Sequence, residues 1–237
     1  MICPPDGDLS PIETDVAIVG SGPVGLSLAL ALDRAGVRTA VIESGGEGAE
    51  AWTRRLALAE TIEPANHAVV EASTHRRLGG ASWIWGGRCV DFDPVDFEER
   101  RGDGPPGWPI SHAEAIAEAG PAADFLGIGP PAFDEDLGWL PQDGPLRARL
   151  ERWCADSRLV RRHLADIKAS PRVRFHTGLT CTSVTLDPEA RTTVGLCVKS
   201  RSGAVRMVTA RHYVIAAGGI ESARLLLASE ELNPALP

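Results

Sequence analysis

The residues best suited to chemistry lie near the start of the chain, in a glycine-rich turn and an acid that follows it. Gly20, Gly22 and Gly25 have the spacing G-x-G-x-x-G. In such a turn the glycines permit a tight bend, close approach of a pyrophosphate and close packing of the next helix. Glu43 follows eighteen residues after Gly25, where a carboxylate can accept hydrogen bonds from both ribose hydroxyls. The acid also disfavours a 2′-phosphate.

The surrounding elements have the order that such a site requires. Residues 16–19 (VAIV) form an apolar run, typical of a parallel strand covered on both faces. Pro23 suits the first turn of a helix, because that turn needs no N–H from it, and Gly36 ends the helix. A second strand over 39–42 then delivers Glu43. A chance glycine turn is the alternative, but the full order predicts a dinucleotide-binding unit.

Composition limits the class of protein. The chain has 237 residues, 43% of them hydrophobic, and a net charge of -8, enough for one large domain or one and a half. Nucleic-acid binding would need a positive face. A membrane span needs roughly 18 apolar residues, and the first residues lack the basic and apolar pattern of a secretion signal. We therefore expect a cytoplasmic protein that binds neither nucleic acid nor membranes.

The five cysteines do not indicate a cross-linked or metal-binding framework. Their number is odd, they are widely spaced, and no C-x-x-C pair occurs among Cys3, Cys89, Cys154, Cys181 and Cys197. Secreted disulfide scaffolds and zinc sites both use closer, paired spacings. We expect reduced thiols and no metal site.

The order of elements after Glu43 favours FAD over NAD. A nicotinamide-binding domain would continue to alternate strands and helices, whereas here a Gly-, Arg- and Trp-rich stretch reaches about residue 108. Helices are expected at 49–58, at 113–119 behind the capping box Ser111-x-x-Glu114, at 146–156 and at 159–168. A β-meander is then expected from four strands, at 173–177, 181–187, 192–200 and 204–210.

The chain next returns to the first pattern. Residues 213–216 form an expected buried strand, Gly218 and Gly219 a tight turn, and residues 220–229 a helix. A parallel sheet interrupted by a meander, with a glycine-rich return at its end, is typical of flavoprotein dinucleotide domains.

The segment 74–98 adds a third glycine-rich feature. Two Gly-Gly pairs flank Ser82, Trp83 and Trp85, an arrangement that suits neither helix nor strand. Backbone N–H groups of such a loop can reach phosphate or ring oxygens, and tryptophans can wall a flavin ring. A Trp-anchored surface loop is the alternative. The neighbouring arginines can neutralise a pyrophosphate or simply be solvated: Arg76, Arg77 and Arg88.

These motifs resemble those of the glucose-methanol-choline oxidoreductases. The resemblance rests on GSGPVG with Glu43, LGGAS followed by WGGR, FDPVDFE, GWPIS and AAGGIESARLLLAS, in the family's order from about Asp15 to Ser229. It is nearest to the bacterial branch that oxidises sugars and polyols, around pyranose oxidase. It implies an α/β fold: a Rossmann-like FAD-binding domain with a parallel sheet plus a β-meander, and a short, partly helical insert. The implied FAD-binding domain has a first segment at 10–108 and a second at 171–237, separated by the insert at 109–170, with the family's C-terminal substrate domain largely absent.

The resemblance also implies a cofactor site. The pyrophosphate would lie against Gly20, Ser21, Gly22 and Gly25, and the adenosine ribose against Glu43. The flavin side would lie against Gly79, Gly80, Ser82, Trp85 and Gly86, the adenine near the backbone of Cys181, and the ribitol and diphosphate against Ala217 and Gly218. Some members join flavin covalently to a histidine at the position of Ile84, so the implied FAD is non-covalent.

The implied reaction is hydride transfer from an alcohol carbon to flavin N5. The family's base and its partner, two histidines or a histidine and an asparagine, are expected beyond residue 237, so no catalytic residue is expected here. His75, beside the LGG loop, is the one histidine considered for a flavin contact. The chain would act with a small alcohol or sugar and a separate C-terminal half. A non-catalytic flavin-binding module and an NAD-dependent dehydrogenase are the alternatives.

Overall fold

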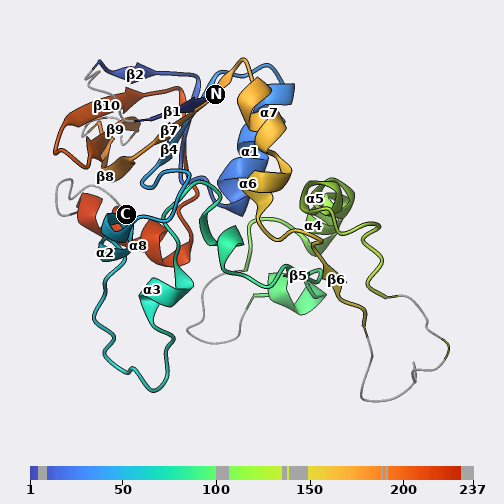
Figure 1. Ribbon diagram of the computed structural model, residues 1–237. Helices are drawn as coiled ribbons and strands as arrows, with labels where there is room; N and C mark the ends of the chain where they lie inside the picture. The colour runs from blue at the N-terminus through green and yellow to red at the C-terminus, as the bar shows by residue number, and fades with distance from the viewer. Residues whose placement is uncertain are drawn as a thin grey trace. The chain divides into compact units, whose positions relative to one another are not determined.

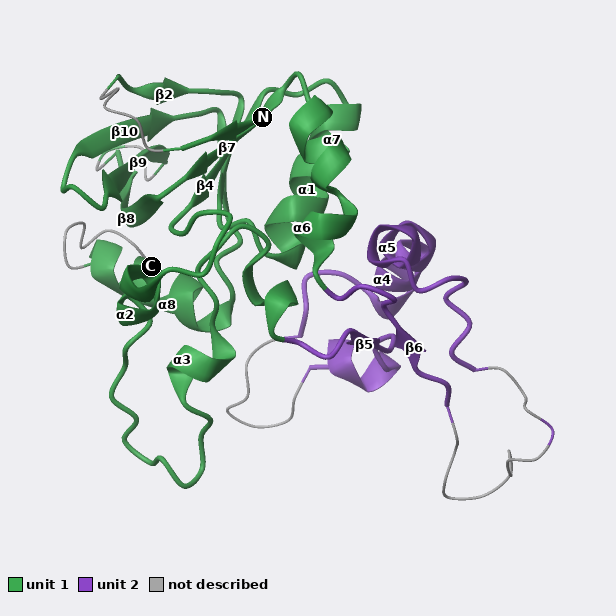
Figure 2. Ribbon diagram, in the orientation of Figure 1, with its two compact units in different colours: residues 1–84, 158–237 green, residues 85–157 purple. Residues whose placement is uncertain are grey.

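The computed structural model of the chain forms two compact units (Figure 2). It describes residues 1–4, 10–99, 107–134, 138, 149–187, 189 and 192–230. One unit contains residues 1–84 and 158–237, and the other contains residues 85–157. These divisions differ from the domain boundaries expected from the sequence, and the functional boundaries stay a prediction.

A five-stranded parallel sheet is the centre of the first unit (Figure 1). The predicted strands β3 (Val16–Val19) and β4 (Thr39–Glu43) are confirmed, and both are buried along their whole length. The strand order is β1-β7-β4-β3-β11, with β1 at Ile2–Cys3, β7 at Val173–Thr177 and β11 at His212–Ile215. β11 is only partly buried, contrary to expectation, because it is the edge strand and pairs with β3 alone.

Helices connect and flank this sheet as the sequence indicates. α1 (Pro23–Arg34) begins with the predicted proline and joins β3 to β4. α8 (Gly219–Glu230) follows β11. The single helix expected at 159–168 is two helices, α6 (Leu159–Arg162) and α7 (Leu164–Ala169), because the backbone of His163 leaves the helical region between them.

The meander forms a second sheet of four strands, in the order β2-β10-β9-β8. Its strands are β2 (Ile12–Glu13), β8 (Leu179–Leu186), β9 (Thr193–Ser200) and β10 (Val205–Thr209). Buried side chains of both sheets share one hydrophobic core, including Ala17 and Ile42 from the first and Leu196 and Val198 from the second. The assignment of 173–177 to the meander was wrong: this strand is β7, which pairs in parallel with β4.

The remaining elements differ more from the expectations. The helix expected at 49–58 is shorter, α2 (Ala51–Arg55), and α3 (Val70–Ser73) follows it. Two 3-10 turns occur at η1 (Gly80–Trp83) and η2 (Pro94–Phe97). The predicted capping box of Ser111 and Glu114 is confirmed at the start of α4 (His112–Ala117), which α5 (Ala119–Leu126) follows.

The helix expected at 146–156 was wrong over its described part. Residues 146–148 lie outside the described residues, and the chain from 149 to 156 contains no helix. It forms β6 (Arg152–Trp153), which pairs antiparallel with β5 (Arg88–Cys89). Residues 152–153 form a strand because they pair with β5. Each of the two strands is too short to show a strand period in the sequence.

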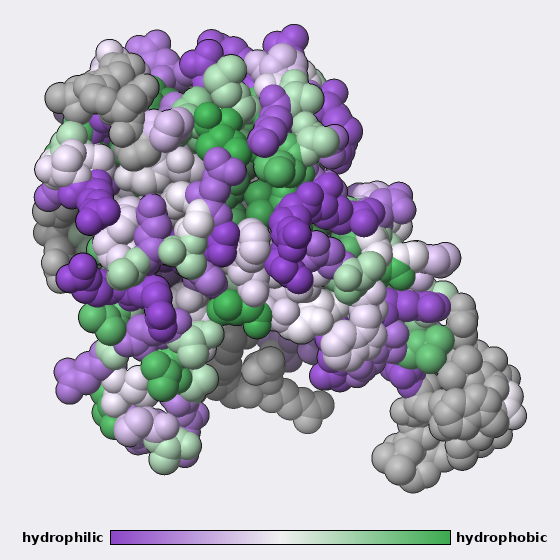
Figure 3. Space-filling view, viewed as in Figure 1, coloured by the Kyte–Doolittle hydropathy of each residue, from purple (hydrophilic) through white to green (hydrophobic). Residues whose placement is uncertain are grey.

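The described surface carries mixed polarity. Hydrophilic and hydrophobic residues are interspersed over the described face seen in Figure 3. Every helix within the described ranges is too short or too polar to cross a bilayer. In the same part of the chain, no three His, Cys, Asp or Glu side chains are grouped to hold a metal ion.

Candidate FAD-binding site

A cavity of about 270 Å³ lies where β3, β4 and β11 end. It is lined by the last residues of these strands and those that follow, including Gly20 after β3, Glu43 at the end of β4 and Ala216 after β11. Because the three strands are parallel neighbours, their carboxyl ends meet at one edge of the sheet. That edge is where open α/β sheets bind their ligands.

The glycine turn after β3 is shaped by close backbone contacts. Gly20 has φ of +98°, and a Cβ on it would lie 2.5 Å from the carbonyl oxygen of Ala216. A Cβ on Gly25 would lie 2.0 Å from the carbonyl oxygen of Gly20. These two glycines therefore allow the turn and the packing of α1 on β3, as the fingerprint requires.

Gly22 has a different environment. A Cβ there would meet no atom within 4 Å, and its φ of -64° is open to any residue. It is the N-cap of α1, which has 12 residues. Gly218 and Gly219, at the start of α8, likewise face free space and line the same cavity. The absence of side chains at these glycines leaves free space beside a helix N-terminus. Such a place suits a phosphate group.

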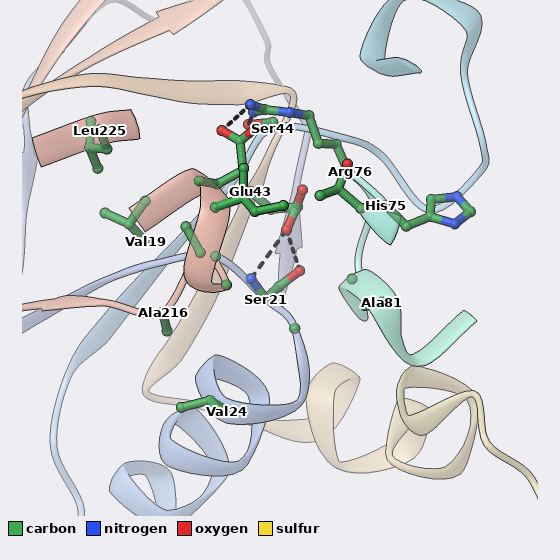
Figure 4. Close-up of a pocket in the computed structure, with 18 of the residues that line it drawn as sticks. Val19, Ser21, Val24, Glu43, Ser44, His75, Arg76, Ala81, Ala216 and Leu225 are labelled. Carbon is green, nitrogen blue, oxygen red and sulfur yellow. Dashed lines mark hydrogen bonds and ion pairs between the residues drawn. The ribbon is translucent and has the colours of Figure 1, made fainter. Parts of the chain in front are cut away.

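Glu43 is held beneath the turn by three hydrogen bonds. Its Oε2 accepts from the backbone N of Ser21 at 3.1 Å and from the Oγ of Ser21 at 2.6 Å, and its Oε1 accepts from the backbone N of Gly45 at 2.9 Å. Figure 4 shows the carboxyl group directed at Ser21. Burial raises the pKa of Glu43, and the hydrogen bonds from Gly45 and Ser21 oppose that rise. Three of the roughly four lone-pair sites of the carboxylate are thus used, and Oε1 keeps capacity for one ribose hydroxyl.

The loop of residues 74–80 contacts the glycine turn that follows β3. The backbone N of Gly79 donates to the carbonyl oxygen of Ser21 at 3.2 Å. A Cβ on Gly80 would lie 2.8 Å from the Cα of Gly22, so only glycine fits there. The Oγ of Ser82 donates to the carbonyl oxygen of Gly79 at 2.6 Å, which closes the turn of this loop.

Arg76 connects the same loop to α8. Its guanidinium donates to the Oγ of Ser44 at 3.1 Å and forms an ion pair with Glu221. The side chains of Arg76 and Glu221 are each only 11% exposed. Arg224 adds a second contact to Glu221, at 2.7 Å. Figure 4 shows Arg76 reaching to Ser44, while the ring of His75 points away from Glu43 and Ser21. Two arginines thus balance the one acid that α8 brings to the cavity.

The structure brings most of the predicted site residues together. Eight line the cavity: Gly20, Ser21, Gly22, Glu43, Gly80, Cys181, Ala217 and Gly218. Gly25, Gly79 and Ser82 do not line it and support the turns that do. Trp85 and Gly86 belong to the other unit. The contacts of all these residues with a cofactor stay predictions.

Two charged residues of the site were not predicted from the sequence. Glu221 and Arg224 both line the cavity. The available signal was the second strand-glycine-helix junction, whose helix starts at the same sheet edge as α1. Of the three arginines considered for a pyrophosphate, Arg76 alone lines the cavity. Arg77 instead stacks on Trp83, 3.6 Å from the ring centroid.

Known proteins share segments of this sequence and this fold. A family described as an FAD binding domain matches residues 13–75. The 2-methyl-1,2-propanediol dehydrogenase of Mycolicibacterium austroafricanum is 25% identical over 284 residues, which cover 92% of this chain and 51% of that protein.

Three solved structures share the fold. Formate oxidase aligns with a TM-score of 0.58 at 16% identity, over 93% of this chain and 48% of that one. The pyridoxine 4-oxidase of Mesorbium loti gives 0.55 at 20% identity, over 91% and 52%. An FAD-dependent oxidoreductase from Chaetomium thermophilum gives 0.60 at 18% identity, over 91% and 47%. The chain spans about half the length of these relatives.

The two sheets, the cavity and the sequence match define an FAD-binding domain, in agreement with the choice of FAD over NAD. Its fold is shared with about half of formate oxidase and of pyridoxine 4-oxidase, in agreement with the resemblance of the motifs to the FAD-binding part of the glucose-methanol-choline oxidoreductases. The nearer resemblance to the branch around pyranose oxidase stays a prediction.

Proposed function

We propose that this chain is the FAD-binding portion of an oxidoreductase that oxidises the CH-OH group of an alcohol, sugar or polyol. The observation that carries the proposal is the cavity where β3, β4 and β11 end, because Glu43, the start of α1 and two glycine-lined free spaces converge there. The name of the Mycolicibacterium relative, a diol dehydrogenase, supports the CH-OH donor class.

We assign the pyrophosphate, the ribose and the adenine of FAD to separate regions of the cavity. The first turn of α1 would hold the pyrophosphate through backbone N–H groups at Gly22 and beyond. Glu43 would accept a hydrogen bond from a hydroxyl of the adenosine ribose at its Oε1. The backbone at Cys181 would face the adenine, and burial raises the pKa of its thiol to about 12, so this thiol stays neutral beside the base. Bound FAD would supply the acceptor of hydride, at flavin N5.

Residues outside this chain would handle the substrate's proton. Among the described histidines, His75 alone lines the cavity. Burial, and then Arg77 and Arg54, lower its pKa, so it is neutral at pH 7, but its ring points away from the turn (Figure 4). We assign the base and its partner to the C-terminal half of the family pattern, beyond residue 237. Ile84 in place of a histidine favours FAD held without a covalent bond.

A flavin-binding module without catalysis is the second candidate. The observation that favours it is the coverage of only about half of each relative. The two candidates share the cofactor and differ in the need for a second polypeptide.

Absorbance spectroscopy of the purified chain tests the cofactor assignment. We expect the bands of oxidised flavin, and acid precipitation should release all of the flavin as free FAD. A colourless protein that also fails to bind added FAD would contradict both candidates. Flavin that stays with the acid-precipitated protein would contradict the non-covalent assignment.

A mixing experiment separates the two candidates. The flavin-loaded chain is combined anaerobically with the C-terminal half of the diol dehydrogenase relative, and primary alcohols, diols and sugars are added. Bleaching of the flavin that requires both the second polypeptide and a substrate supports the oxidoreductase. If no alcohol or sugar bleaches the flavin although the two polypeptides co-elute, the module without catalysis is the better account.

A further inference from the structure

Two of the five cysteines lie face to face in the second unit. The Sγ atoms of Cys89 and Cys154 are 4.0 Å apart, although 65 positions separate the residues in the sequence. Both side chains are partly exposed, and both thiols are free. The odd number and wide spacing of the cysteines had given no sign of this pair.

The chain around the two thiols is fixed by several contacts, and we call residues 85–89 and 151–157 the neck of this unit. β5 and β6 pair within it. The backbone N of Cys154 donates to the carbonyl oxygen of Gly87 at 2.8 Å. The Nε1 of Trp85 donates to the carbonyl oxygen of Ser157 at 2.7 Å, and Arg88 pairs with Glu151. The two chain segments are thus held together whatever the state of the thiols.

Gly87 lies close to Cys154. Its φ is +77°, and a Cβ on it would lie 3.3 Å from the Cβ of Cys154. A disulfide needs an S–S distance of about 2.05 Å. The two sulfur atoms, now 4.0 Å apart, would have to approach by about half of that distance.

We propose that Cys89 and Cys154 form a reversible disulfide across the neck when the protein meets hydrogen peroxide. One thiolate attacks a peroxide oxygen, which yields a sulfenic acid and hydroxide. The other thiolate attacks the sulfenic sulfur and expels the second oxygen as water. In total, two thiols and one H₂O₂ give one disulfide and two waters, and a small-molecule dithiol restores both thiols.

The order of the two attacks does not change the need for a Cys89 thiolate. If Cys89 attacks peroxide, it must be deprotonated, and if Cys154 attacks first, Cys89 must be deprotonated to resolve the sulfenic acid. Burial, and secondly Cys154, raise the pKa of Cys89 to about 11. Closure should therefore be slow at neutral pH and accelerate as the pH rises toward that pKa.

Peptide mapping tests the proposal on the intact chain. The protein is treated with hydrogen peroxide at pH 8.5, alkylated and digested with trypsin without reduction. Cleavage after arginine puts Cys89 in the peptide 89–100 and Cys154 in the peptide 153–158, while the other three cysteines fall in separate peptides. We expect these two peptides joined, with a mass lower by two hydrogen atoms. Titratable thiols should fall from five to three and return to five with dithiothreitol.

Variants provide the controls. Cys89→Ser and Cys154→Ser should each abolish the joined peptide, whereas Cys3→Ser should leave it unchanged. If either of these two variants fails to fold, the peptide map of the oxidised wild-type protein tests the proposal by itself. Separate peptides after oxidation, a joined pair that involves another cysteine, a cross-link between two molecules, or oxidation of Cys89 beyond the sulfenic acid would each overturn the proposal. So would closure at the same rate from pH 6 to pH 9.

Discussion

Gly22 is the residue of the turn at which a larger side chain can be added without disturbing the apoprotein. Its backbone is unstrained, and a Cβ there meets free space inside the cavity. The Val side chain of Gly22→Val would fill the space proposed for the pyrophosphate. We therefore expect loss of FAD retention with a nearly unchanged thermal midpoint of the apoprotein, measured by flavin content and by circular dichroism.

Two other glycines serve as controls for that variant. Gly48→Val changes an exposed glycine that also meets no atom within 4 Å, and it should keep FAD. Gly25→Val places a side chain 2.0 Å from the carbonyl oxygen of Gly20 and should prevent folding. Normal FAD content in Gly22→Val would show that the pyrophosphate does not lie at this turn.

Glu43 should make the stability of the apoprotein depend on pH. Because burial raises its pKa in the folded state, the unfolded chain releases this proton at lower pH than the folded chain does. The free energy of unfolding should therefore decrease as pH rises from the ordinary value of 4.5 through the raised pKa. Glu43→Gln should remove that decrease, as measured by urea unfolding between pH 4.5 and pH 8.

The same variant should weaken FAD binding. Gln offers one acceptor oxygen where Glu43 uses two, and its NH₂ group would face an N–H donor. A lost hydrogen bond to a charged group costs about 1.5–3 kcal/mol, so the dissociation constant should rise about ten- to a hundredfold. Glu47→Gln, at an exposed position, is the matched control. Equal affinity in both variants would exclude Glu43 from the cofactor site.

The fingerprint residues were predictable because their constraints are local. The positive φ of Gly20 and the close contact of Gly25 follow from the turn itself, which the spacing G-x-G-x-x-G specifies. Glu221 was not predictable in this way. Its partner Arg76 lies 145 positions earlier, and nothing in the local sequence records that contact.

At the scale of elements, the pair of Arg76 and Glu221 joins the loop of 74–80 to α8. Both side chains are nearly buried, and removal of one partner from a buried pair costs up to about 3–5 kcal/mol. Arg76→Met should cost less than this limit, because Arg224 still neutralises Glu221. Glu221→Leu should cost more, because it leaves the nearly buried guanidinium of Arg76 without its carboxylate partner.

A double-mutant cycle measures this coupling. The double variant, Arg76→Met with Glu221→Leu, should be more stable in urea unfolding than the sum of the single effects predicts. The exposed pair of Arg38 and Asp15 supplies a reference cycle, whose coupling should be much smaller because water screens it. Additive effects at Arg76 and Glu221 would mean that the pair does not connect the two elements.

Elements with a strong period or cap were predicted well, and short extended segments were not. α1, β3, β4 and the capping box of α4 came from the sequence because proline, glycine and apolar runs mark them. β7 alternates buried and more exposed residues. This pattern fits a strand near the edge of a parallel sheet as well as a strand of a meander. Only its pairing with β4 decides between these positions.

At the scale of the whole molecule, FAD should stabilise the fold because it binds the folded state alone. At a free concentration of a hundred times Kd, the free energy of unfolding should rise by about 2.7 kcal/mol. Differential scanning calorimetry with increasing FAD should show a midpoint that climbs with concentration. AMP should produce a smaller shift, and a midpoint that ignores FAD would contradict binding at this cavity.

The walls of the cavity are made at very different times during synthesis. β3 and α1 leave the ribosome early, whereas β11 and α8 are the last described elements of the chain. At ordinary translation speeds of about 5–20 residues per second, the second wall follows the first by roughly 10–40 s. A nascent chain can therefore hold its glycine turn but not a closed cavity. Cofactor loading should begin only after Leu225, the last residue that lines the cavity, has emerged.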